Sequence, residues 1–281
     1  MAHWRQDQRD TYPVRAGPSS ASRACGRSLL PLPVLAVAAS VACFSSTACV
    51  AAYLGLAVRF ATERGAPLAK SNYPVHRSIF AVDIQGSTSR LRTNPVKEQL
   101  RAEVYSLLYR SMGDVGIVEA YRDPPADRGD GVLVTIRPAD QVPKTLLLNR
   151  LAPRLTSHLV DYNRGLPEAE RPQRQLRLRA VAHAGEVHFD GRGCFGEAVD
   201  LAFRLLNAPR FKACLAHGSS PLALIVSEDI YWSIVRHDYD GIRSRDYHQI
   251  AQVTVTGRRH RGWVHIPWRD RDGEARFRLA S

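Results

Sequence analysis

Three short stretches of the sequence place charged side chains where they could act together on one ligand. "VDIQGST" ends an apolar run on Asp83 and continues into small residues. "DRGDGVLVTI" places Asp130 directly before Gly131 and a second apolar run. "FGEAVDLAFRL" separates Asp200 from Arg204 by one helical turn. A carboxylate at a hairpin tip is easily aimed at the end of a neighbouring strand, so the first two stretches could bring Asp83 and Asp130 to one site.

Each stretch also has an ordinary structural explanation. Asp83 and the residues after it could form a polar strand end followed by a helix cap. An Asp-Gly pair between two extended runs is the commonest hairpin signal, with Gly131 supplying a positive φ. Asp200 and Arg204 could form a surface ion pair, which stabilises a helix by only about 0.2–0.5 kcal/mol. Taken singly, none of the stretches establishes a site, and their order along the chain therefore carries the argument.

The hydrophobic pattern from Ser78 onward predicts strands that alternate with helices. We expect helices near 95–112, 144–163, 196–207 and 228–236. We expect strands near 78–84, 117–122, 131–136, 176–184, 222–227, 250–256 and 261–266. This order predicts an α+β domain with a ferredoxin-like core, in which helices cover one face of a sheet.

The three motifs, in their order and spacing, resemble the catalytic domain of the class III nucleotidyl cyclases, the adenylate and guanylate cyclases. The resemblance covers residues 78–210 closely and extends loosely to about 268. It implies the class III cyclase fold and a domain that binds a nucleoside triphosphate with Mg²⁺ or Mn²⁺. It also implies formation of a 3′,5′-cyclic nucleotide and pyrophosphate in intracellular signalling, by a homodimer whose subunits share each site.

The resemblance assigns a role to each motif. In the family two aspartates hold two divalent metal ions, and by motif match these are Asp83 and Asp130. Such hard cations bind carboxylate and phosphate oxygens, so the assignment is chemically reasonable. Backbone N–H groups in the loop after Asp83 would face the phosphates. The helix motif implies that Asp200 and Arg204 contact the ribose and the charge that develops in the transition state. The predicted phosphate-binding residues are Ile84, Gln85, Gly86, Ser87 and Thr88.

The sequence departs from the family pattern at three positions. Asp200 stands where the family has Asn, and it lacks the amide donor. Ala126 and Gly193 occupy the two positions that usually select adenine or guanine, and neither side chain can hydrogen-bond a base. The base is therefore open, to be read by Arg128, by Asp127 or by the backbone. The alternative function is a catalytically degenerate cyclase fold that serves as a signalling or partner-binding module.

The N-terminal quarter differs in composition from the rest. Residues 29–58 carry no charge and are long enough to span a bilayer, which fits a membrane anchor or a signal segment. We predict disorder at 1–28, the anchor or signal at 29–58 and a linker at 59–76. We predict the cyclase-like domain at 77–268 and a tail at 269–281. Because a cyclase needs intracellular nucleotide, the resemblance places the domain in the cytoplasm, tethered to the membrane if 29–58 is an anchor.

The composition leaves several ligand classes open. The chain has 281 residues, a net charge of +12 and a pI of about 9.9, which suits polyanions in general. Its five cysteines show no disulfide or zinc spacing, and no glycine-rich P-loop or Ser-His-Asp set is present. The basic stretch "TGRRHRGW" at 256–263 could bind nucleic acid, but no nucleic-acid motif accompanies it. We therefore regard this stretch as a solvated strand turn and do not favour nucleic acid as a partner.

Overall fold

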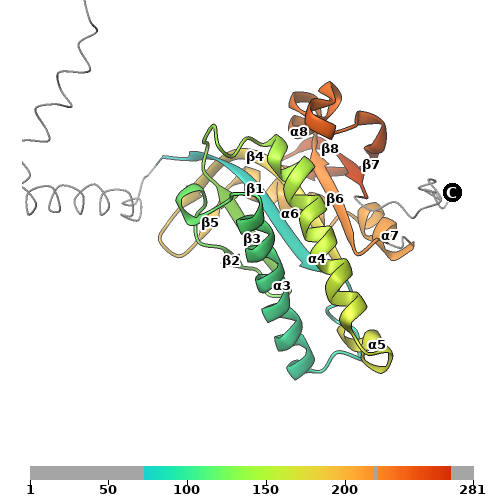
Figure 1. The fold of residues 1–281 in the computed structure, drawn as a ribbon. Coiled ribbons are helices and arrows are strands. Elements are labelled where there is room, and N and C mark those ends of the chain that lie inside the picture. The colour runs from blue at the N-terminus through green and yellow to red at the C-terminus, as the bar shows by residue number, and fades with distance from the viewer. Residues whose placement is uncertain (1–72, 218–219, 267–281) are drawn as a thin grey trace, which may run out of the picture. The chain divides into compact units, whose positions relative to one another are not determined.

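An eight-stranded mixed sheet runs through residues 73–217 and 220–266, which are the residues that the computed structural model describes (Figure 1). The strand order is β2-β3-β1-β4-β6-β8-β7, and β5 pairs with β4 outside this path. Neighbouring strands are antiparallel except β4 and β6, which are parallel. The strands are β1 (Val75–Ile84), β2 (Ala126–Asp127), β3 (Gly131–Ile136), β4 (Leu178–Phe189), β5 (Cys194–Phe195), β6 (Leu222–Ser227), β7 (His248–Val255) and β8 (Arg258–His265).

Helices cover both faces of this sheet. Phe80, Val82 and Ile84 of β1 point to one face, where they pack in a cluster with α3 and α4. Ile79 and Ala81 point to the other face and pack in a second cluster with α6 and α7. The prediction of helices on one face is therefore wrong. The helices are α3 (Asn94–Asp114), α4 (Ala152–Gly165), α5 (Arg171–Arg174), α6 (Glu197–Leu206), α7 (Pro209–His217) and α8 (Glu228–Ser233).

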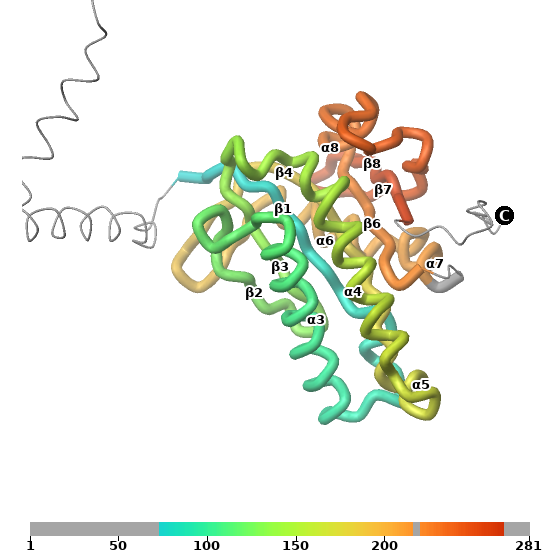
Figure 2. The backbone as a smooth tube through the Cα atoms, viewed as in Figure 1, coloured from blue at the N-terminus to red at the C-terminus, as the bar shows by residue number. Residues whose placement is uncertain are grey.

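β1, an interior strand of the sheet, explains the two-sided packing. Its last eight residues are all buried, since β3 and β4 flank it and helices lie above and below. Strands that are covered on both faces read as continuous apolar runs rather than as alternating ones. Figure 2 shows α3 and α4 on the same side of β1, in agreement with their shared cluster. The run "SIFAV" in β1 is continuous rather than alternating, as expected of a strand that is covered on both faces.

The first part of the domain has the element order expected of a ferredoxin-like core, with one edge strand reduced. β1 is followed by α3, then by β3, α4 and β4, and β1 lies between β3 and β4 in the sheet. The prediction of a strand at 117–122 is wrong. A 3₁₀ turn occupies Glu119–Tyr121, and a single bridge joins Arg122 to Ile136. The edge next to β3 is thus formed by that bridge and by the two-residue β2.

The remaining predictions agree with the structure to within about five residues, but the short elements β2, β5 and α5 were not predicted. β3 and β6 have the predicted bounds, and a π-helical turn at Leu147–Leu151 leads into α4 within the predicted helix 144–163. Helix α7 was not predicted. Further short 3₁₀ turns lie at Glu168–Glu170, Val235–His237, Tyr239–Gly241 and Ser244–Asp246.

The predictions for the N-terminal segments and for the tail at 269–281 lie outside the described residues, apart from the last few residues of the linker 59–76. Within 73–217 and 220–266, no helix has both the length and the apolar character needed to cross a membrane.

Replacing Gly131 by alanine should destabilise the domain. A Cβ at this position would lie 2.5 Å from the carbonyl oxygen of Val82 on β1. Because the clash is with the backbone of a buried interior strand, the variant should lose about 1–3 kcal/mol in the free energy of unfolding, measured with urea. Gly113→Ala in α3 is the matched control, since its Cβ would meet no atom within 4 Å. The control should be neutral or slightly stabilised, and equal stabilities for the two variants would contradict the packing described.

Candidate functional site

Asp83 lies near the end of β1, between residues of both neighbouring strands. It is opposite Gly131 on β3 and opposite Arg179 on β4. The Asp83 side chain forms an ion pair with the Arg179 guanidinium, and both residues are buried. Burying an unpaired carboxylate is costly, so the cross-strand arginine is what allows the strand to end on an acidic residue.

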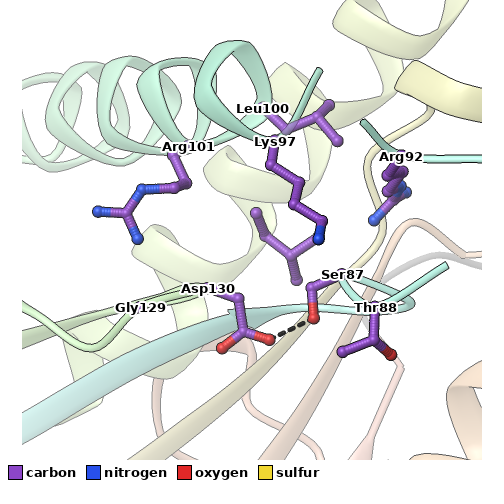
Figure 3. Close-up of a pocket in the computed structure, with 9 residues that line it drawn as sticks. Ser87, Thr88, Arg92, Lys97, Leu100, Arg101, Gly129 and Asp130 are labelled. Carbon is purple, nitrogen blue, oxygen red and sulfur yellow. Dashed lines mark hydrogen bonds between the residues drawn. The ribbon is translucent and has the colours of Figure 1, made fainter. Parts of the chain in front are cut away.

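Asp130 lies at the tip of the hairpin that joins β2 to β3. The Arg128 amide donates to the Gly131 carbonyl over 3.0 Å and closes this turn. The positive φ falls on Gly129, at 80°, and not on Gly131 as expected from the Asp-Gly signal. Gly131 is needed instead for its close approach to β1. The Asp130 carboxylate accepts a hydrogen bond from the Ser87 hydroxyl (Figure 3).

The structure thus brings Asp83 and Asp130 together, as their motifs suggested. Burial raises the pKa of Asp83 to about 6. The positive charge of Arg179 opposes this shift, and the neighbouring Asp130 carboxylate adds to it by repulsion. Two acidic groups that influence each other this directly can share one cationic ligand.

A cavity of about 380 Å³ opens at this pair. Both carboxylates line it, together with residues 84–88 of the loop that follows β1. Three cationic side chains also line it, from Arg128, Arg179 and Lys212. The cavity therefore combines two carboxylates with three cations, which suits an anionic ligand that also binds metal ions.

The loop after β1 offers fewer free amides than predicted. The Ile84 amide donates to the Asp130 carbonyl over 3.0 Å, and the Gln85 amide donates to the Arg177 carbonyl over 2.8 Å. These two N–H groups are therefore committed to the fold, and the prediction that they face phosphate needs correction. The amides of Gly86, Ser87 and Thr88 remain candidates. The positive φ of Gly86, 70°, turns the loop at this point.

The carboxylate pair fits a divalent metal ion of the Mg²⁺ or Mn²⁺ class. The Oδ1 atom of Asp83 is buried and has no hydrogen-bond partner within the described chain. Buried carboxylate oxygens normally have a partner, and a hard cation bound with the neighbouring Asp130 would supply one. Within the described ranges no group of three or more His, Cys, Asp or Glu residues could hold a metal. The chain itself would therefore contribute few ligands beyond Asp83 and Asp130.

Asp200 and Arg204 do not join the carboxylate pair within one chain. Both side chains are exposed on α6 and lie outside the residues that line the cavity. Three neighbours of theirs on α6 or just after it do line the cavity, namely Phe203, Leu206 and Asn207. The family resemblance implied this separation, because there the helix residues serve the site of the other subunit.

The positions expected to select a base also lie outside the cavity. Ala126 is on β2, and Gly193 is in an exposed turn where its amide donates to Asp190. Asp127 pairs with Arg101 of α3, whereas Arg128 lines the cavity and lies over the Phe203 ring at 5.3 Å. Of the two side chains considered for base reading, only Arg128 thus lines the cavity.

A second, adjoining cavity of about 330 Å³ lies beside α3 (Figure 3). It shares Ile84, Ser87, Thr88 and Asp130 with the first cavity. Lys97 of α3 extends toward this shared loop (Figure 3). Asp83 does not line this cavity, so the larger cavity, which contains both carboxylates, is the candidate site.

The sequence analysis missed two cations of the site. Arg179 occurs in "LRLRAVAHAG", where alternation marks a strand but cannot reveal which residue of β1 it opposes. Lys212 lies on α7, a helix that the pattern did not predict. The signal that could have indicated α7 is the spacing of Phe211 and Leu215, which are four residues apart and fully buried.

Comparisons with known proteins add a likeness of fold. No protein-family model matches the sequence, and no curated protein matches it. The structure is similar to those of adenylate and guanylate cyclase catalytic domains. An adenylate/guanylate cyclase/hydrolase from Silicibacter pomeroyi shares 19% identity at a TM-score of 0.48, over 69% of this chain and 98% of that one. The guanylyl cyclase Cya2 shares 15% identity at a TM-score of 0.47, over 68% of this chain and 91% of that one.

The adenylyl cyclase CyaB from P. aeruginosa shares 16% identity at a TM-score of 0.46, over 69% of this chain and 94% of that one. At these identities and TM-scores the likeness says nothing about activity, metal binding or ligands. The functional argument rests on the residues of the cavity.

The burial of Asp83 predicts a specific pH dependence of stability. Its pKa is about 6 in the folded chain and 3.8 ordinarily, so the folded state holds the proton more tightly. Stability linked to this group is therefore complete below about pH 4 and is lost as the pH rises through about 6. Asp83→Asn lacks the group. The difference in the free energy of unfolding, wild type minus variant, should decrease as the pH rises from about 4 to about 7. Urea titrations at each pH measure it, and a difference that is independent of pH would contradict the environment described.

Proposed function

We propose that residues 77–268 form a nucleotide cyclase domain that binds a nucleoside triphosphate with Mg²⁺ or Mn²⁺. The observation that carries this proposal is the carboxylate pair, Asp83 and Asp130, facing a cavity that is also lined by cations and by a loop of small residues. Few ligands other than a metal-bound polyphosphate need both signs of charge in so small a space.

The residues of the cavity divide between metal and phosphate. Asp83 and Asp130 would hold the metal ions, two in number by analogy with the cyclase family. A bound metal would polarise the α-phosphate and favour ionisation of the 3′-hydroxyl group. The amides of Gly86, Ser87 and Thr88 would hold phosphate oxygens. Arg179, whose Nε atom is buried and has no partner among the described residues, could donate to the same group.

The reaction would be an intramolecular displacement. The ribose 3′-oxygen would bond to the α-phosphorus, and the bond from that phosphorus to the α,β-bridging oxygen would break. The 3′-hydroxyl proton would pass to solvent, and the products would be a 3′,5′-cyclic nucleotide and pyrophosphate. The contribution of this chain would be to align the reacting groups and to balance charge, which is most of what catalysis of phosphoryl transfer requires.

The site would be completed by a second subunit. Arg204 is exposed on α6 and lies outside the cavity of its own chain, so it could reach the cavity of a partner in a homodimer. A guanidinium aimed at the α-phosphate would stabilise the charge of the transition state. Asp200 would lie beside the ribose, where it can accept but not donate a hydrogen bond. Since the substrate is intracellular, the domain would act in the cytoplasm, tethered to the membrane if 29–58 is an anchor.

A cyclase fold without turnover, serving as a signalling or partner-binding module, is the second candidate. The ion pair between Asp83 and Arg179 favours it, because an oxygen that binds a guanidinium is not free for a metal. The residues at the base-selecting positions, Ala126 and Gly193, also favour this second candidate, because neither side chain can hydrogen-bond a base. The two candidates differ in one measurable property, which is formation of a cyclic nucleotide.

The cyclase proposal predicts turnover that depends on both aspartates. The full chain, with MnCl₂ or MgCl₂, should convert at least one of ATP, GTP, CTP and UTP to its cyclic nucleotide and pyrophosphate, detected by mass spectrometry. Asp83→Asn and Asp130→Asn should each lower kcat by at least about 100-fold, because the metal ligands are lost. Exposed Asp140→Asn is the control and should retain activity. Absence of product with every triphosphate and both metals would reject the cyclase and favour the module.

A shared site predicts complementation between two inactive variants. Asp83→Asn and Arg204→Ala should each be inactive alone. When the two chains are co-expressed, half of the dimers should be mixed, and each mixed dimer should have one intact site. Activity should then return to about a quarter of the wild-type value. Co-expression of Asp83→Asn with Asp130→Asn is the control and should restore nothing, because both residues belong to one half-site. Equal outcomes for the two mixtures would contradict the shared site.

A further inference from the structure

Helix α7 is fixed in place by its apolar face. Phe211 and Leu215 are fully buried in the cluster that α7 shares with α6 and the sheet. The Arg177 guanidinium donates to the carbonyl oxygen of Leu215, near the end of the helix. An exposed side chain beside this buried face of α7 is therefore presented from a rigid element, which favours precise contact with a ligand.

Lys212 is exposed on this helix and lines the larger cavity, beside residues of β1 and β4. Its charge is close enough to lower the pKa of Asp83. None of the ion pairs formed by the described residues involves Lys212. The ammonium group thus lies near the carboxylate pair without being bound to it.

The other two cations of the cavity already have partners. Arg179 is bound to Asp83, and Arg128 donates to the Cys194 carbonyl over 3.2 Å and lies over the Phe203 ring. Lys212 is therefore the cation of this cavity whose charge is uncommitted. A lysine is a flexible point charge that suits phosphate oxygens without demanding a fixed orientation.

We propose that Lys212 binds the β- and γ-phosphates of the triphosphate ligand and holds pyrophosphate after the reaction. The inference rests on the proposed function, since the α-phosphate must lie at Asp83 and Asp130 for cyclisation. The terminal phosphates carry most of the ligand charge and would extend from that pair to the uncommitted cation. Lys212 would then supply affinity for the polyphosphate chain, and the base would play no part in this contact.

The test measures binding of the polyphosphate alone, by calorimetry on the full chain in the presence of MgCl₂. The probes are inorganic tripolyphosphate and pyrophosphate. Lys212→Ala should weaken both by about tenfold, because one charge-assisted contact of about 1.4 kcal/mol is lost. Lys212→Arg should restore most of the affinity. Arg210→Ala is the matched control, since it removes an exposed cation from the same helix at a position that does not line the cavity. The affinity of this control for both probes should stay within about twofold of the wild-type value.

The outcomes separate this inference from the proposed function. Wild-type affinity in Lys212→Ala would overturn the inference, even if the enzyme cyclises nucleotide. An equal loss in Arg210→Ala would also overturn it, because the effect would then be general electrostatics. Tripolyphosphate binding that depends on Lys212, in a chain that forms no cyclic nucleotide, would reject the cyclase and support the inference. A wild-type chain that binds neither probe would overturn the inference, whereas the cyclase proposal is decided separately by formation of a cyclic nucleotide. Thermal unfolding of each variant, expected to match the wild type, excludes misfolding as the cause.

Discussion

The ion pair between Asp83 and Arg179 is the interaction on which the candidate site depends. β1 is an interior strand and is covered on both faces, so a carboxylate near its end is withdrawn from water. Such a charge is tolerated only when it is paired, and the pairing of β1 with β4 places a guanidinium directly opposite it. The same strand, through its register with β3, faces Gly131 and so determines where Asp130 lies. The site is therefore a consequence of strand register.

This dependence makes the loop after β1 part of the framework. The Ile84 and Gln85 amides bind carbonyls from two other segments, which anchors the start of the loop to the hairpin and to the entry of β4. The sequence can change little here without disturbing the carboxylates, because Gly131 lies against the backbone of β1 and has no room for a side chain. Preorganised groups of this kind need little rearrangement when charge develops on a ligand, which is the usual origin of electrostatic catalysis.

The sequence predicted those features that are encoded locally. The apolar runs predicted the bounds of β3 and β6, and the motifs drew attention to Asp83 and Asp130, which border such runs and both line the cavity. Properties that depend on which segments meet could not be predicted. The register that sets Arg179 against Asp83 is one, and the use of the Ile84 amide by Asp130 is another. The unbroken apolar run in β1 is typical of a strand buried on both faces, and the prediction of helices on one face did not use this signal.

The balance of charge in the cavity bears on the order in which ligands bind. With Asp83 held by Arg179, the free chain already neutralises the carboxylate that a metal ion would need. A metal ion at the unpaired Oδ1 atom of Asp83 would therefore be repelled by the nearby guanidinium, whereas an incoming phosphate can draw that guanidinium toward its own oxygens. Phosphate binding would then release the carboxylate as a metal ligand, so the two ligands should strengthen each other's binding. By thermodynamic reciprocity the metal must raise the affinity for phosphate by the same factor. On this argument the ion pair is compatible with a metal-dependent site, because it ties occupation of the metal site to the presence of the phosphate ligand.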